Sequence, residues 1–140
     1  MQLKQILKLC VLALIGGITY MLIELAWRGY SHISMFILGS LCFLLLGGIN
    51  EFLPWELGFV WQMLIGAGIV TILELIFGIV VNVWLELEVW DYSNLPFNFM
   101  GQICLPFSFA WTLLSGVAIV VDDYLRYWLF GEEKPHYKIL

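Results

Sequence analysis

The sequence predicts an all-α integral membrane protein: a single domain built as a bundle of four membrane-spanning helices. The chain of 140 residues is 62% hydrophobic and only 12% charged, whereas soluble domains average about 25% charged residues. Residues 29–50 and 92–121 contain no charged side chain at all. A soluble protein of this length could not bury so much apolar surface. The lipid bilayer is therefore the expected surrounding.

Four segments are long and apolar enough to cross a bilayer, which takes about 20 residues of helix. They occupy residues 7–27, 33–50, 57–85 and 103–121. Their apolar runs are continuous, whereas the strands of a membrane barrel alternate over about 10 residues. Aromatic residues gather near the segment ends, as expected for rings that prefer the lipid headgroup zone.

The first segment resembles a secretory signal peptide at its start. Lys4 and Lys8 precede an apolar run, but no small-residue cleavage site follows, and Glu24 and Arg28 continue the segment. We therefore expect a retained first helix.

The distribution of Lys and Arg predicts the orientation, because cytoplasmic loops carry an excess of these residues. Four spans place both termini on one side. That side collects five of the six basic residues, which are Lys4, Lys8, Arg126, Lys134 and Lys138. The opposite side has only Arg28. Both termini should therefore be cytoplasmic, and the polar segment 86–98 should face outward.

The tail, residues 122–140, is expected to contain a separate helix that lies on the cytoplasmic surface of the membrane. Asp122 and Arg126 stand four residues apart and can form an ion pair along one helix face. Such a helix could be a simple anchor or a docking element for a partner.

Glu74 is the most unusual residue, because it lies in the middle of the third span. An ionisable side chain at the centre of a membrane helix costs at least about 2.5–3.5 kcal/mol, and no basic residue lies within one turn of it. Thr71, Gly78 and Asn82 fall on roughly the same helix face. Glu74 should therefore be neutral or meet a polar partner from another helix; its role is a binding site or a polar pin that fixes helix register.

Three further polar residues recur at intervals of four near the outer end of the first span: Glu24, Arg28 and His32. If the first helix continues through all three, they share one face. They would then form either a ligand or proton site or a structural ion pair at a helix end.

The polar segment 86–98 interrupts two apolar spans. Asp91, Ser93 and Asn94 favour turns, and Pro96 restricts Leu95 to extended backbone. Irregular backbone near the membrane survives only where protein or water covers it. We therefore expect an ordered loop folded back onto the outer end of the bundle, with Asp91 hydrogen-bonded to it.

Common catalytic and cofactor signatures are missing from the sequence. There is no Walker A, GxSxG or HExxH motif, and no metal-spaced group of His or Cys. We therefore expect no catalytic residue, metal or cofactor. Nucleic acid is not an expected partner, since six basic residues form no patch.

Four stretches together resemble a known bacterial family, the CmpB-like proteins described as type IV ABC-transporter permeases. They are "WRGYSHISMF", "ELIFGIVVN", "VWDYSNLPFNFMGQICLPFS" and "DDYLRYWLFGE". The resemblance implies a multi-pass protein of the bacterial inner membrane, a role in transport, and an ATPase on a separate chain or another transporter subunit as a possible partner. The candidate binding positions that it suggests are Glu24, Arg28, Ser31, His32, Glu74, Asn82, Asp91, Tyr92, Asn94 and Gln102.

These observations lead to a first hypothesis of a transport or ligand-binding membrane protein, expected to be a homo-oligomer, with an outward-facing polar pocket for an unknown small ligand. In this hypothesis Arg28 holds an anionic group or pairs with Asp91, and Glu74 takes up a cation or proton. Two alternatives remain. One is a structural or regulatory subunit without transport activity. The other is an intramembrane enzyme that acts on a lipid-like substrate, with His32 or Asp91 as the acid or base.

Overall fold

The computed structural model describes residues 2–140 and confirms the predicted fold class. Its helices are α1 (Gln2–Arg28), α2 (Ile33–Phe52), α3 (Phe59–Gly78) with its π-helical extension η1 (Ile79–Trp84), and α4 (Leu105–Phe130). All four helical segments are long and apolar enough to cross a membrane. The proline of the last apolar run, Pro106, lies in the first turn of α4, where the missing backbone N–H costs nothing.

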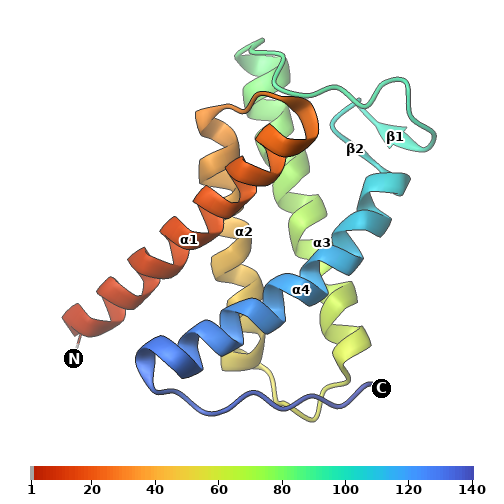
Figure 1. Ribbon diagram of the computed structural model, residues 1–140. Coiled ribbons are helices and arrows are strands. Elements are labelled where there is room, and N and C mark those ends of the chain that lie inside the picture. Colours follow the sequence, from red (N-terminus) through yellow and green to blue (C-terminus); the bar gives the residue numbers. More distant parts are fainter. Residues whose placement is uncertain (1) are drawn as a thin grey trace.

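The helices pack most extensively in two pairs, α1 with α2 and α3 with α4, and α4 slants across the bundle (Figure 1). Glycines bring α1 and α2 close together. A Cβ atom at Gly39 would lie 2.6 Å from Cβ of Tyr20, and one at Gly16 would collide with Phe43. Helix α2 also packs against α3 and α4, whereas α1 makes little contact with either of them. Much of α1 is therefore left exposed.

Both termini lie at the same end of the bundle, which is the lower end in Figure 1. The α2–α3 connection also lies there, while the α1–α2 turn and the long loop before α4 lie at the upper end. This arrangement agrees with the predicted number of spans. The assignment of the lower end to the cytoplasm stays a prediction.

Helix α1 ends at Arg28 and does not continue to His32. Gly29 adopts a left-handed conformation, with φ of 78°, which glycine tolerates better than other residues. His32 is instead the N-cap of α2, and its ring nitrogen Nδ1 accepts a hydrogen bond of 3.1 Å from Ser34 N. The prediction that Glu24, Arg28 and His32 share one face of the first helix is therefore wrong for His32, which lies outside that helix.

The long loop (residues 85–104) folds onto the upper end of the bundle. It contains a short antiparallel pair of strands, β1 (Asn98–Phe99) and β2 (Ile103–Cys104). Four of its non-glycine residues have positive φ: Glu86, Glu88, Phe97 and Met100. Such conformations are uncommon, and surrounding contacts must hold them.

The C-terminal residues differ from the expected separate interfacial helix. Helix α4 continues without a break from Leu105 to Phe130 and ends at Gly131, whose φ is 67°. Residues 131–140 are irregular and return along the lower end to α3, where Lys138 O accepts a hydrogen bond of 2.5 Å from Phe59 N. The helix-compatible residues after Val121 simply extend the fourth span, and the tail then supplies a backbone acceptor to the first turn of α3.

Candidate functional site

The carboxyl group of Glu74 lies at the centre of the candidate site. Its side chain is 3% exposed, and Oε2 accepts a hydrogen bond of 2.5 Å from the indole nitrogen of Trp111 on α4. The other oxygen, Oε1, has no hydrogen-bond partner among residues 2–140. As predicted, the partner comes from another helix; that it is a tryptophan was not foreseen.

A small cavity of about 20 Å³ adjoins this carboxyl group, lined also by Tyr20, Trp90, Tyr92 and Trp111. A space of this size accommodates about one water molecule. Tyr92 enters from the long loop and stacks on Phe107 of α4, with ring centroids 4.6 Å apart. Burial, followed by the negative charge of nearby Glu74, raises the pKa of the Tyr92 phenol above its ordinary value. Tyr92 therefore presents a neutral phenol beside the carboxyl group of Glu74.

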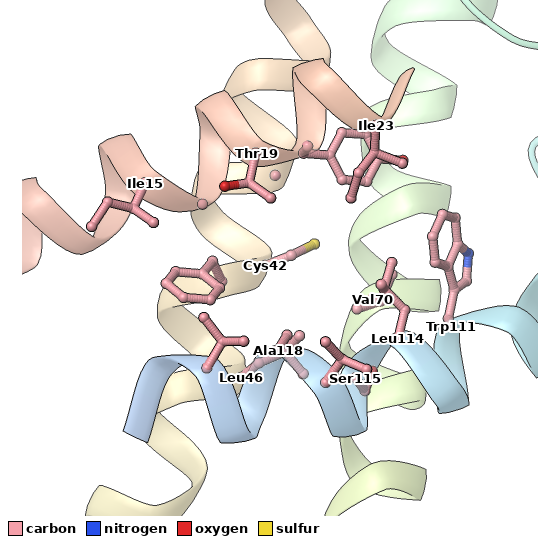
Figure 2. A pocket seen from close by; sticks show the side chains of 16 residues that line it. Ile15, Thr19, Ile23, Cys42, Leu46, Val70, Trp111, Leu114, Ser115 and Ala118 are labelled. Carbon is pink, nitrogen blue, oxygen red and sulfur yellow. The ribbon is translucent and has the colours of Figure 1, made fainter. Parts of the chain in front are cut away.

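A larger apolar cavity of about 150 Å³ lies between α1, α2 and α4, next to the small one. Figure 2 shows Ile15, Thr19 and Ile23 of α1 on one side and Leu114, Ser115 and Ala118 of α4 on the other, with Cys42 of α2 between them. Tyr20 and Trp111 border both cavities. Their ring centroids are 6.3 Å apart, so these two rings separate the apolar space from Glu74.

Asn82 and Gln102 join the long loop to the top of α3. Asn82 Nδ2 donates to Gln102 Oε1 at 2.8 Å, while Asn82 Oδ1 accepts from the backbone N–H groups of Val89 and Trp90 at 2.7 and 3.3 Å. The ring nitrogen of Trp90 donates to Gln102 O at 3.0 Å. These two predicted site residues therefore lie together, but their polar atoms bond to the loop.

Glu24 and Arg28 form the ion pair that the sequence suggested. Arg28 Nε lies 2.5 Å from Glu24 Oε2, and Arg28 Nη1 donates a hydrogen bond of 2.8 Å to Val89 O of the long loop. The guanidinium group also lies over the ring of Tyr30, 4.6 Å from its centroid. Arg28 thus ties the loop to α1, and it pairs with Glu24 and not with Asp91.

The other predicted residues lie apart from Glu74. Asp91 is exposed and accepts hydrogen bonds from the backbone and hydroxyl of Ser93, which lower the pKa of its carboxyl. The expected bond from Asp91 to the bundle is therefore wrong, because the side chain closes a local turn instead. Asn94 is exposed. The hydroxyl of Ser31 is buried and has no hydrogen-bond partner among residues 2–140.

A second polar cluster, which the sequence did not reveal as a unit, lies at the lower end of the bundle. Asp122 is fully buried and pairs with Arg126 at 2.7 Å, as predicted from their spacing. Arg126 Nη1 also lies 3.5 Å from Glu51 Oε1 of α2. Asp123 Oδ2 accepts from Asn50 Nδ2 at 2.6 Å and from the Tyr137 hydroxyl at 2.8 Å. The signal for this cluster was the concentration of polar residues at the ends of two apolar spans.

One family matches nearly the whole chain. The family described as "Putative ABC-transporter type IV" (ABC_trans_CmpB) matches residues 9–132. The chain belongs to this family. It is therefore an ABC-transporter-related membrane protein, in agreement with the resemblance noted in its sequence. The matched region of this type IV ABC-transporter family begins within α1 and continues past the end of α4. No curated protein and no solved structure gives a significant match.

Proposed function

We propose that this chain is the membrane-spanning, ligand-binding component of a transport system. Its ligand would be a molecule dissolved in the lipid, with an apolar chain and a cationic or hydrogen-bond-donating head. The observation that carries this proposal is the apolar cavity next to a buried carboxyl group that has one free oxygen. Predominantly apolar pockets with a few polar groups are typical ligand sites.

The ligand would enter sideways from the membrane. Residues of α1 and α4 line opposite sides of the apolar cavity, yet these two helices make little direct contact. Because water is excluded from the hydrocarbon region, a molecule that reaches this gap comes from the lipid. An apolar chain would then lie against Ile15, Leu114 and Ala118.

The head group would reach Glu74 past Cys42 and Val70, which border both cavities beside the rings of Tyr20 and Trp111. A cationic or donor head is favoured because Glu74 Oε1 has no hydrogen-bond partner within the described chain. This places the site below the polar pocket that the sequence suggested. At the upper end, Asn82 and Gln102 already bond to the long loop, and Arg28 pairs with Glu24.

The proposed transport system includes an ATPase on another chain. The family supports such a partner, and this sequence contains no Walker A motif. We place the partner at the lower end, where the α2–α3 connection and the tail lie. A homo-oligomer in the bacterial inner membrane completes the proposal, with the exposed apolar face of α1 as the contact surface.

A structural or regulatory subunit is the second candidate. The observation that favours it is the long loop, whose hydrogen bonds involve three of the predicted site residues: Asn82, Gln102 and Arg28. In this case the polar residues near the upper end would serve assembly alone.

Photolabelling of the purified protein in lipid nanodiscs tests the proposed function. The probe is a long-chain alkylamine that carries a diazirine on its chain. Ala118 lines the apolar cavity, whereas Ala110 on the same helix is exposed. Ala118→Trp should fill the cavity and reduce labelling of α2 and α4 by about tenfold, while the matched Ala110→Trp should label like the wild type. Equal labelling of both variants would remove the cavity as the ligand site and favour the structural subunit.

A further inference from the structure

The lower end of the bundle contains a polar cavity of about 350 Å³, separate from the membrane-embedded site. It is lined by Asn50, Glu51, Trp55, Asp123, Arg126, Glu132 and Glu133. Four of these seven residues are acidic. The volume falls within the range of about 300–1,000 Å³ that is typical of small-molecule sites.

The charges around this cavity do not balance. Arg126 is held by Asp122 and Glu51, and Lys8 pairs with Glu132 at 3.1 Å. Asp123 forms no ion pair with any residue in the range 2–140, although it lies 4% exposed on the cavity wall. Around the cavity itself, five carboxyl groups therefore face two basic side chains of the described residues, Arg126 and Lys8. The five are Glu51, Asp122, Asp123, Glu132 and Glu133. The excess negative charge would attract a cation.

Asn50 gives a second, independent indication of a ligand. Its side chain is 8% exposed and lines the cavity. While Nδ2 donates to Asp123, the side-chain oxygen Oδ1 has no hydrogen-bond partner among the described residues. A buried acceptor without a donor is costly, so a ligand with N–H groups would complete it.

The ring of Trp55 narrows the chemistry of the ligand. It forms part of the cavity wall beside the carboxyl groups, and it stacks on His136 of the tail with centroids 4.8 Å apart. Aromatic faces attract ammonium and guanidinium groups, which also donate hydrogen bonds to carboxylates and amides. Carboxylates, an amide oxygen and an indole ring together favour an organic cation.

We propose that this cavity binds an ammonium or guanidinium group, with Glu51, Asp123 and Asn50 as acceptors and Trp55 as the aromatic wall. The group could belong to a free small molecule or to a basic side chain of another protein that docks at this end. This site is distinct from the lipid-accessible cavity beside Glu74, so the experiments that test it do not depend on the proposed function.

Calorimetric titration of the full-length protein in nanodiscs tests the proposal. The probes are agmatine, which has a guanidinium and an ammonium group, and the capped peptide acetyl-Gly-Arg-Gly-amide. We expect saturable binding of at least one probe, and a rise in melting temperature on its addition. Tighter binding of agmatine would indicate a free cation as the ligand, whereas tighter binding of the peptide would indicate a side chain of a partner.

Two matched variants show whether the cavity itself is the site. Glu51 lines the cavity, whereas Glu56 is exposed on the same end and does not line it. Loss of one charge-assisted contact should weaken binding by about tenfold in Glu51→Gln, while Glu56→Gln should bind like the wild type. Glu133→Gln, which removes a charge from the cavity lining at an exposed side chain, should also weaken binding and guards against a variant that fails to fold. Absence of binding to the wild type, equal affinity of Glu51→Gln and Glu56→Gln, or displacement of the probe by equimolar Mg²⁺ would overturn the proposal.

Discussion

At the scale of single residues, the membrane-embedded site depends on one contact between distant parts of the chain. Trp111 donates to Glu74 from a position 37 residues further along the sequence. A carboxyl group that is buried in a membrane needs such a donor, because few alternatives exist in the hydrocarbon region. The indole N–H satisfies one oxygen and leaves the other free for a ligand.

Glu74→Gln should therefore affect ligand binding, whereas Trp111→Phe should affect the stability of the protein. Glutamine keeps an oxygen that accepts the indole N–H, so Glu74→Gln should retain the wild-type melting temperature while alkylamine photolabelling falls by about tenfold. Trp111→Phe removes the donor and leaves a buried acceptor unpaired, which should lower the free energy of unfolding by about 1–3 kcal/mol. Thermal unfolding in detergent and photolabelling separate the two. Wild-type labelling in Glu74→Gln would show that this carboxyl is only a structural pin.

Local residue pairs were predictable from the sequence, whereas long-range partners were not. The pair of Asp122 and Arg126 follows from helical spacing alone. Trp111 was not predicted as the partner of Glu74, because nothing in its neighbourhood in the sequence indicates which residue on α3 it faces. His32 was misplaced since a single glycine, Gly29, ends α1 before the expected row is complete. Glu74 could be recognised as a candidate site residue from the sequence alone. The free-energy cost of burying an ionisable side chain in a membrane does not depend on which partner it has.

At the scale of elements, the long loop is held to the bundle by a few side chains. Asn82 makes three hydrogen bonds, one to Gln102 and two to loop backbone. The sequence correctly predicted turns at Asp91 and Ser93, but it could not show that the side chain of Asn82 accepts a hydrogen bond from the backbone of Val89. Asn82 lies within the π-helical turn η1, which no pattern of apolar residues predicts.

Asn82→Ala should release the long loop. It removes three hydrogen bonds at once, and we expect a loss of about 2–4 kcal/mol in the free energy of unfolding, since each contributes about 0.5–1.5 kcal/mol. Amide exchange of residues 85–104 should accelerate. Asn94→Ala is the matched control, because Asn94 is exposed on the same loop and its loss should change stability by less than about 0.5 kcal/mol. Similar exchange in both variants would contradict the anchoring role of Asn82.

The α1–α2 pair depends on close approach at glycines. A methyl group at Gly39 would lie 2.6 Å from Cβ of Tyr20, whereas one at Gly68 on α3 would meet no atom within 4 Å. Gly39→Ala should therefore push α1 away from α2 and destabilise the protein by about 1–3 kcal/mol. The control Gly68→Ala should be neutral or stabilising, because alanine favours a helix over glycine. Equal unfolding free energies for the two variants would contradict this packing.

At the scale of the whole molecule, the sequence predicted the number of long helices but not their mutual positions. Apolar length decides whether a segment spans a membrane, so the four helices were visible. The pairing that leaves α1 beside α2 alone depends on glycine contacts on facing helices. The same limit explains why the tail was expected to form a separate helix. Helical spacing after Val121 does not distinguish an extension of α4 from a new helix.

The orientation of the bundle is the last prediction and follows from charge alone. The structure places the tail and the loop containing Ser93 at opposite ends, and five of six basic residues lie in segments at the lower end or near it. The positive-inside rule then makes the lower end cytoplasmic. After replacement of the three native cysteines by alanine, Ser93→Cys should react with a membrane-impermeant maleimide added to intact cells. Lys138→Cys should react only after the membrane is opened. Ser93 is exposed, so poor reactivity cannot be attributed to burial, and labelling in the reverse pattern would invert the topology. An inverted bundle would also place the acidic cavity outside the cell, where a cytoplasmic partner could not reach it.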